Sequence, residues 1–174
     1  MKYLDIYTRM FSLVYMNAMF SNDERTNIGA VLTNSDHDVL SMGYNQIPSK
    51  VRDTSYRQSR GEKQNWFDHA ERNAIYNAAK LGIATKDSIL FTNGIPCPDC
   101  TIGVIQAGIS HIVVDHHWNM HNSNPEKYNR SIAMLMDAGI EVELWYDTPI
   151  TKITGLRNEK FIDLNDKETF DVSV

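Results

Sequence analysis

The sequence predicts one α/β domain in which a five-stranded mixed sheet carries helices on both faces, in three layers. Three observations predict it: a helix-periodic N-terminal segment, two strand-like segments joined by a short turn, and then a regular alternation of strand and helix patterns. Such alternation favours right-handed crossovers and a mostly parallel sheet. We expect a single domain over residues 1–174, with a core at about 5–146 and an extension at 150–174.

The first twenty residues carry apolar side chains at helical spacing, which predicts an amphipathic helix. Segments 28–32 and 39–44 are strand-like, and the turn-rich residues 34–38 between them indicate an antiparallel hairpin. The periodic positions of the first helix are Leu4, Tyr7, Phe11, Val14, Tyr15 and Ala18.

The rest of the chain alternates between the two patterns. Gly82, Gly108 and Gly139 each follow a helix-like segment, where glycine suits the left-handed C-terminal cap. Asn124 and Pro125 supply an N-cap and a first helical residue. We expect helices over 70–81, 99–107 and 125–138, and strands over 88–91, 111–115 and 141–146, and we assign no element within 150–174.

Composition excludes several classes of protein. The formal charge of −5 disfavours a broad nucleic-acid-binding surface, which is normally basic, so we expect no stable nucleic-acid partner. No apolar run has the length of a membrane span, and residues 1–5 lack the start of a signal peptide. The chain has two cysteines. If both bind metal, none is left for a disulfide, and a reducing, cytoplasmic location follows.

A pattern typical of a catalytic zinc site decides the function. His69 and Glu71 lie in the tripeptide H-A-E, and Cys97 and Cys100 lie in a P-C-P-D-C segment further on. Zinc binds N and S ligands, and a catalytic site typically uses three protein ligands and leaves the fourth position for water. Zinc lowers the pKa of that water, and the unliganded Glu71 could carry its proton as general acid and base.

The two cysteines fit a redox pair or a structural zinc site less well. A redox C-x-x-C pair usually opens a thioredoxin-like pattern, which the preceding residues lack. A structural zinc site needs four protein ligands, and the chain has only these two cysteines. Positions three apart share a helix face, so both sulfurs at the start of the 99–107 helix could reach one metal. The positive end of that helix also favours thiolates.

The motif resembles that of the cytidine/deoxycytidylate deaminase superfamily, H-x-E followed by P-C-x-x-C, the signature and mechanism known for zinc nucleobase deaminases. Segments 28–31 (I-G-A-V), 69–75 (H-A-E-R-N-A-I) and 106–109 (Q-A-G-I) are also similar to family segments, so the resemblance covers about residues 5–145. It implies the cytidine deaminase-like fold and one catalytic zinc per chain. The implied metal ligands are His69, Cys97 and Cys100, and Glu71 is the implied catalytic residue.

The resemblance is nearest to deoxycytidylate (dCMP) deaminases. Residues 43–48 resemble their G-Y-N-x-x-P segment, which implies that Asn45 contacts the sugar, although a strand end and turn would also explain these residues. Ala70, inside H-A-E, is a further substrate-binding candidate. Gln46 replaces the usual glycine, and residues 92–96 are one residue longer than usual.

The twenty-three residues between Asn45 and His69 resemble the longer, arginine-containing insert of dCMP deaminases. Five cations face two acids over residues 50–63, a local charge of +3, although such a run is often only a solvated surface. Arginine binds phosphate oxygens bidentately, so Arg60 is the first candidate for the 5′-phosphate, followed by Arg57 and Lys63.

We therefore expect hydrolytic deamination of dCMP to dUMP and ammonia, feeding thymidylate synthesis. The alternatives within the enzyme class are other substrates, namely deoxycytidine, dCTP, a 5-modified dCMP or guanine. Outside it they are a nucleic-acid-editing or nucleic-acid-binding protein, or a degenerate scaffold, which the intact Glu71 disfavours. The resemblance also implies a homo-oligomer, often a hexamer, with dCTP as activator and dTTP with Mg²⁺ as inhibitor, but no residue indicates an effector site. The absence of further cysteines predicts no second, structural zinc. Residues 116–119 (H-H-W-N) follow a predicted strand near the expected site. They could form a surface loop, or an aromatic side chain among them could stack on the base.

Overall fold

A computed structural model describes residues 5–119, 125–147, 154–157 and 160–163. None of its described helices is long and apolar enough to span a bilayer. The elements, in chain order, are α1 (Ile6–Ala18), β1 (Gly29–Thr33), β2 (Val39–Tyr44), α2 (Ser55–Gln58), α3 (Lys63–Trp66), α4 (Ala70–Leu81), β3 (Ile89–Thr92), α5 (Pro98–Gln106), β4 (His111–Asp115), α6 (His116–Asn119), α7 (Pro125–Asp137), β5 (Glu141–Trp145), β6 (Thr154–Arg157) and β7 (Lys160–Asp163).

The main sheet has five strands in the order β2-β1-β3-β4-β5. β1 is antiparallel to both β2 and β3, whereas β3, β4 and β5 are parallel. The mixed sheet and the hairpin are therefore confirmed: in the described sheet β2, β3, β4 and β5 all run in the same direction, and β1 is reversed. The reason is that α4 carries the chain from β2 across β1 to β3, so the two strands beside β1 run in the same direction.

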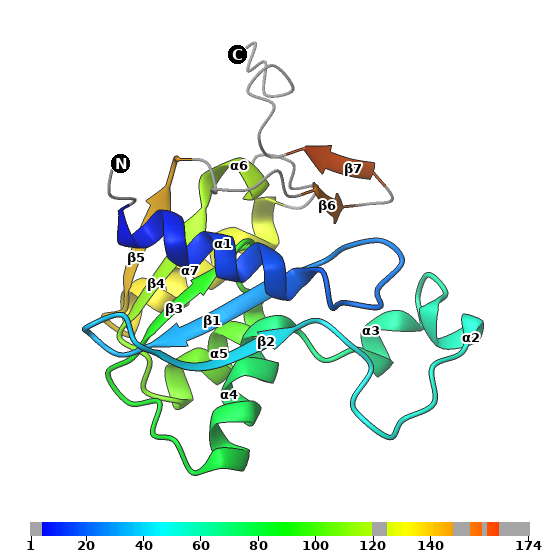
Figure 1. Ribbon diagram of the computed structural model, residues 1–174, viewed down its shortest axis with the longest axis horizontal. Helices are drawn as coiled ribbons and strands as arrows, with labels where there is room; N and C mark the ends of the chain where they lie inside the picture. The colour runs from blue at the N-terminus through cyan, green and yellow to red at the C-terminus, as the bar shows by residue number, and fades with distance from the viewer. Residues whose placement is uncertain (1–4, 120–124, 148–153, 158–159, 164–174) are drawn as a thin grey trace.

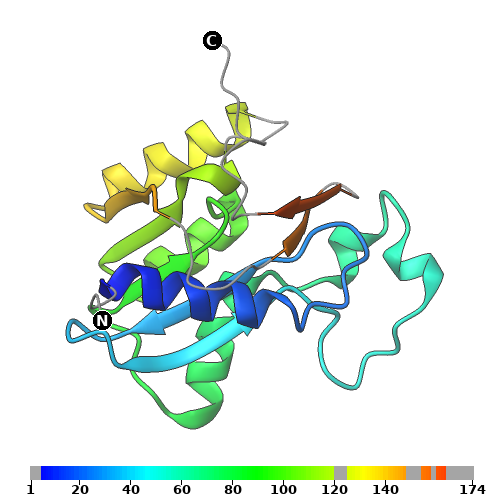
Figure 2. The ribbon, with the colours of Figure 1, turned by 45° about the horizontal axis from the view of Figure 1, so that its top comes forward.

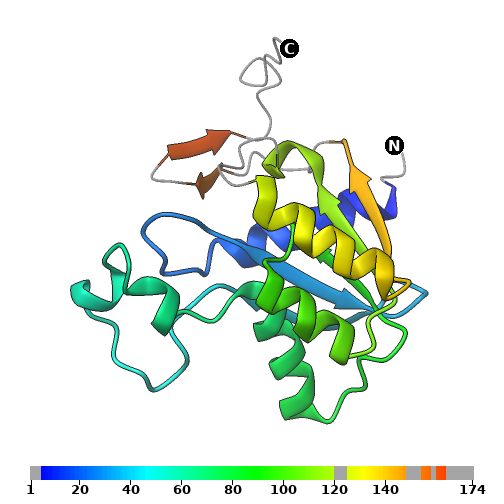
Figure 3. The same cartoon turned by 180° about the vertical axis from the view of Figure 1, so that it is seen from behind.

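Helices cover both faces of the sheet, as predicted. α1 lies on one face, and α4, α5 and α7 lie on the other (Figures 1 and 3). Alternate residues of the strands point to opposite faces and build one core cluster on each side. Toward α1 the core holds Phe11, Val14, Tyr15, Val31, Phe91, Val113 and Trp145, and on the other side it holds Ala30, Leu32, Ala70, Ala74, Leu90, Val104, Ile112 and Val114.

The element boundaries follow local signals closely. α4 ends at Gly82, which adopts a left-handed conformation with φ 68°, as the sequence predicts. Gly108 and Gly139 have φ 72° and 71° after α5 and α7. Leu4 and Asn124, which entered the helix predictions, lie outside the described residues. The antiparallel hairpin β6–β7 was not predicted, because residues 150–174 show no clear period.

Residues 47–67, which we name the arm, project from the side of the domain (Figures 1 and 2). The arm contains the short helices α2 and α3, which sequence analysis did not assign. α2 lies at its outer end, and α3 lies closer to α4 (Figures 1 and 3). The arm is thus a separate lobe that returns the chain from β2 to His69.

Candidate active site

His69 and Cys97 meet because of the sheet topology. β2 and β3 run in the same direction on either side of β1, so their carboxyl ends lie at the same edge of the sheet. His69 is the N-cap of α4, which follows β2, and Cys97 is the N-cap of α5, which follows β3. Neither side chain makes a capping hydrogen bond. Both are therefore available to bind a ligand at the edge where α/β proteins commonly place their sites.

The side chains of His69, Cys97 and Cys100 converge. Their ligand atoms all lie within 4.8 Å of one another, and this is the cluster of metal-binding side chains found in the described part of the chain. The Cys97 Sγ lies 3.4 Å from the His69 Nδ1. One nitrogen and two sulfurs are the donors that zinc prefers, and three ligands leave a position open. The residues present therefore fit a catalytic zinc.

The two thiols share a hydrogen bond that stabilises one thiolate. The Cys100 side chain, and then His69, lower the pKa of Cys97 to about 3, against the effect of burial. The same bond to Cys97 and burial raise the pKa of Cys100. The hydrogen bond to Cys97 also raises the pKa of His69. The pair thus holds a thiolate at neutral pH, which is the form that binds metal.

Glu71 lies in the first turn of α4 and is only 4% exposed. Burial raises the pKa of its carboxyl, and the charge of His69 opposes that shift. The Cys100 side chain also acts to lower the pKa of Glu71, but Glu71 is not one of the three converging ligands. A buried carboxyl beside the ligands, and not among them, suits a proton carrier.

Backbone pairing fixes His69 against the end of β2. Gln46 and Asp68 exchange two backbone hydrogen bonds, of 3.0 and 2.8 Å. The Asp68 Oδ1 accepts from the backbone N–H of His69 and from the Nε of Arg72, both at 3.1 Å. Because Gln46 acts through its backbone here, the pairing does not require the glycine that the resemblance led us to expect.

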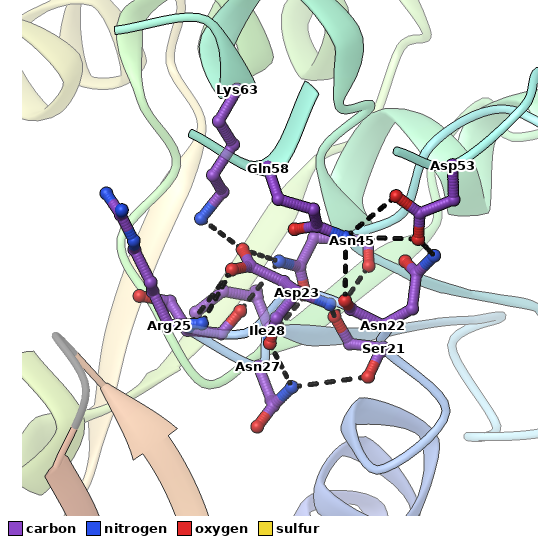
Figure 4. Close-up of polar contacts among 11 residues, drawn as sticks. Ser21, Asn22, Asp23, Arg25, Asn27, Ile28, Asn45, Asp53, Gln58 and Lys63 are labelled. Carbon is purple, nitrogen blue, oxygen red and sulfur yellow. Dashed lines mark hydrogen bonds and ion pairs between the residues drawn. The ribbon is translucent and has the colours of Figure 1, made fainter. Parts of the chain in front are cut away.

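Asn45 and Ala70, the two predicted substrate contacts, are both buried. The Asn45 Nδ2 donates to the Asp23 Oδ2 and to the Thr26 carbonyl, both at 2.7 Å, and its Oδ1 accepts from the Ile28 N–H at 2.8 Å (Figure 4). Both amide donors are thus engaged within the protein, which leaves one acceptor lone pair. The side chain of Ala70 packs in the core, so only its backbone, at the start of α4, could meet a substrate.

The three predicted phosphate ligands differ in their surroundings. Lys63 makes an ion pair with Asp23. The Arg57 guanidinium lies 4.0 Å from the centre of the Trp66 ring and donates to the Arg52 carbonyl. Arg60 is exposed, and the structure records no side-chain partner for it within the described ranges. The structure therefore does not gather the three cations around one point, and Arg60 keeps the least engaged charge.

Two buried residues that support the site were missed. The Asn93 Oδ1 accepts from the Gly29 N–H at 3.0 Å, and its Nδ2 donates to the Asn27 carbonyl at 3.2 Å, four residues before Cys97. Asp23, in the loop before β1, contacts Asn45. The asparagine that follows β3 and the S-x-D turn pattern at 21–23 were the available signals.

Residues 116–119 form the short helix α6 directly after β4. The His117 Nε2 lies 3.0 Å from the Tyr146 carbonyl, and the His116 ring lies 4.3 Å from that of Tyr146. These two side chains are thus engaged with the residue that follows β5. The side chain of Trp118 lies outside the described part, so the structure tests neither of the two alternatives, base stacking or a surface position, for it.

Fold and site together define a zinc-binding deaminase domain, and comparison with known proteins agrees. The family model for the "cytidine and deoxycytidylate deaminase zinc-binding region" matches residues 4–116. The chain is 32% identical to the "uncharacterized deaminase in luxG 3'region" of Aliivibrio fischeri, over 83% of this chain and 95% of that protein. It is 28% identical to human deoxycytidylate deaminase, over 64% of this chain and 65% of that protein's length.

A solved structure shares the fold. The apo dCMP deaminase of cyanophage S-TIM5 superposes with a TM-score of 0.66 at 25% identity, covering 83% of this chain and all of that one. The chain belongs to the cytidine and deoxycytidylate deaminase family and is a zinc-dependent deaminase.

Proposed function

We propose that this enzyme deaminates dCMP to dUMP and ammonia. The observation that carries the proposal is the buried Glu71 beside the converging His69, Cys97 and Cys100. Similarity to human deoxycytidylate deaminase and to the cyanophage dCMP deaminase supports a cytosine nucleotide as substrate. The chain spans 65% of the human enzyme's length, so the substrate needs its own test.

The chain's own residues account for the proton movements that deamination needs. His69, Cys97 and Cys100 would hold the zinc, which would supply a Lewis acid and an activated water. Hydrolysis replaces the amino group at C4 with oxygen from water, so a proton must leave the water and reach N3, and a further one must reach the departing amine. Glu71 is the buried carboxyl beside the ligands and takes and returns these protons.

The substrate's remaining groups would meet the rim of the site. Asn45, with its one free acceptor lone pair, would accept a hydrogen bond from a sugar hydroxyl, and the backbone of Ala70 would contact the base. Arg60, which is exposed on the arm, would bind the 5′-phosphate, with Arg57 and Lys63 as secondary contributors. The proposal extends to a cytoplasmic homo-oligomer that supplies dUMP to thymidylate synthesis, with dCTP and Mg²⁺–dTTP as candidate effectors.

A substrate panel tests the proposal. Ammonia release is measured with dCMP, deoxycytidine, dCTP, 5-hydroxymethyl-dCMP, guanine and oligo-dC, and dCMP should give the highest kcat/KM. A preference for deoxycytidine would contradict a monophosphate substrate. A preference for oligo-dC would make the protein a nucleic-acid-editing deaminase.

Arg60→Ala tests the phosphate contact. Charge-assisted hydrogen bonds contribute about 1.5–3 kcal/mol each, so kcat/KM for dCMP should fall about tenfold to a few-hundredfold. Deoxycytidine lacks the phosphate, so its slow turnover should stay almost unchanged. The matched control is Arg52→Ala, which removes another exposed arginine of the arm and should leave dCMP turnover close to wild type. Equal losses on both substrates would show that Arg60 supports the fold instead.

A further inference from the structure

Asp23 is a buried carboxylate that connects three segments at the edge of the site. Its side chain is 1% exposed. The Oδ1 accepts from the backbone N–H groups of Arg25 and Thr26, at 2.9 and 3.3 Å, which folds the loop before β1. The Oδ2 meets the Asn45 Nδ2 at 2.7 Å and the ammonium of Lys63 (Figure 4). The two oxygens thus have different contacts: the Oδ1 stabilises the loop before β1, and the Oδ2 connects this loop to Asn45, directly after β2, and to the arm.

The contact with Asn45 leads directly to a metal ligand. Asn45 is followed by Gln46, whose backbone pairs with that of Asp68, and Asp68 accepts from the backbone N–H of His69. The Ser21 hydroxyl also donates to the Asn45 carbonyl at 2.7 Å. The orientation of the Asn45 segment is therefore set from the loop before β1.

The second contact of the same oxygen holds the arm. Lys63, in α3, is 24% exposed at its side chain and reaches back to Asp23. A separate contact lies further out, where the Asn22 Nδ2 donates to the Asp53 Oδ2 at 2.7 Å. There the Gln58 Nε2 also donates to the Asn22 carbonyl at 3.1 Å and to both oxygens of Asp53 at 3.0 Å. Of these two connections between arm and loop, only the one through Asp23 also contacts Asn45 in the described structure.

We infer that Asp23 is a positioning residue for the substrate: through its Oδ2 it fixes the Asn45 segment and the arm at the rim of the zinc site. Its effect falls on substrate binding, because it contacts neither the metal ligands nor Glu71. The inference deepens the proposed function and rests on it.

Asp23→Asn isolates the role of the Oδ2. Asparagine keeps an oxygen for the N–H groups of Arg25 and Thr26, but it places an NH₂ against the donors of Asn45 and Lys63. We expect one zinc per chain, a kcat within about threefold of wild type, and a KM raised roughly tenfold, the size of one lost charge-assisted hydrogen bond. Asp53→Asn is the matched control, because it makes the same change in the arm's other contact with the loop, and its KM should stay near wild type.

A double-mutant cycle separates positioning from general support of the fold. If Asp23 acts through Asn45, Asp23→Asn should add little to the loss in Asn45→Ala, because coupled residues are not additive. Additive losses in KM, a fall in kcat with KM unchanged, or an equal effect of Asp53→Asn would overturn the inference.

Two provisions keep the test decisive. Should Asp23→Asn not fold, Lys63→Met breaks the ion pair with Asp23. Its effect is measured with deoxycytidine, which lacks the phosphate that Lys63 is proposed to contact. The rise in KM must shrink in the Asn45→Ala background, and an undiminished rise there contradicts the inference. The cycle is run on whichever substrate of the panel the wild type turns over best. A preference for a substrate other than dCMP therefore contradicts the proposed function alone, whereas additivity contradicts the role of Asp23 alone.

Discussion

Gly43→Ala should destabilise the protein strongly, because β2 and α4 touch at this glycine. A Cβ added there would lie 2.3 Å from the carbonyl oxygen of Ala70 and 2.3 Å from the backbone N of Ala74. Both contacts fall short of the 3.0 Å limit for real Cβ atoms, and neither partner is a flexible side chain. The helix that carries Glu71 must therefore move by roughly 0.7 Å or more. We expect a loss of about 3 kcal/mol, the upper end of the cost of overpacking.

Urea unfolding measures this loss, and zinc content and turnover report its effect on the site. Gly82→Ala is the matched control at the other end of α4. Its φ of 68° disfavours alanine, but no atom lies within 4 Å of the added Cβ, so strain alone should cost about 1–2 kcal/mol. Whatever folded Gly43→Ala protein is obtained should also have lower kcat, because α4 positions His69 and Glu71. The reasoning is refuted if Gly43→Ala is as stable as Gly82→Ala.

Four further outcomes follow from the contacts described. Glu71→Gln should fold and bind one zinc per chain yet lose about 10²–10⁴-fold in kcat, since an amide cannot carry protons; retention of more than about a hundredth of the rate would place acid–base catalysis elsewhere. Cys100→Ser should lower zinc content, measured by metal analysis, and full occupancy with activity intact would contradict the ligand assignment. Asn93→Ala leaves the buried Gly29 N–H without its hydrogen-bond partner and should lower the free energy of unfolding by about 1–3 kcal/mol, measured by urea unfolding. An unchanged midpoint would show that this hydrogen bond does not stabilise the fold. Burial and the hydrogen bond to Glu143 raise the pKa of Tyr7 to about 12, so the contribution of Tyr7 to stability is complete below pH 10 and is lost as the pH rises toward 12. Tyr7→Phe should therefore show a smaller decrease in urea midpoint at alkaline pH than the wild type. Equal decreases would show that ionisation of Tyr7 does not cause the alkaline loss of stability.

Local signals predicted the elements that carry the chemistry. The helical period of α4 and its capping Gly82 lie within about a dozen consecutive residues, so the helix could be predicted locally. The two cysteines lie within one helical turn, so their spacing predicted that they would share a metal. Glu71 could be chosen as proton carrier because it lies two residues from His69 and is not needed as a ligand, and the family resemblance agreed with that choice.

Long-range pairing could not be predicted in the same way. The antiparallel pairing of β1 with β3 depends on which strand lies between β2 and β3, the two strands that α4 connects. No periodic pattern in the sequence indicates this order of strands. The contacts of Asp23 with Asn45 and Lys63 join residues far apart in the chain, and each side chain alone resembles an ordinary polar loop residue. Charge counting likewise marked the arm as cationic without showing that Lys63 is paired and that Arg57 lies on Trp66.

X-ray absorption at the zinc edge of the purified protein shows whether His69, Cys97 and Cys100 hold a catalytic zinc. We predict one zinc per chain with two sulfur ligands at about 2.3 Å and two nitrogen or oxygen ligands at about 2.0–2.1 Å, one of them exchangeable water. In Glu71→Gln the same shell should persist, because Glu71 is not a ligand. A shell without sulfur, a shell of four protein ligands with no water, or loss of the metal in Glu71→Gln would contradict a catalytic zinc held by His69, Cys97 and Cys100.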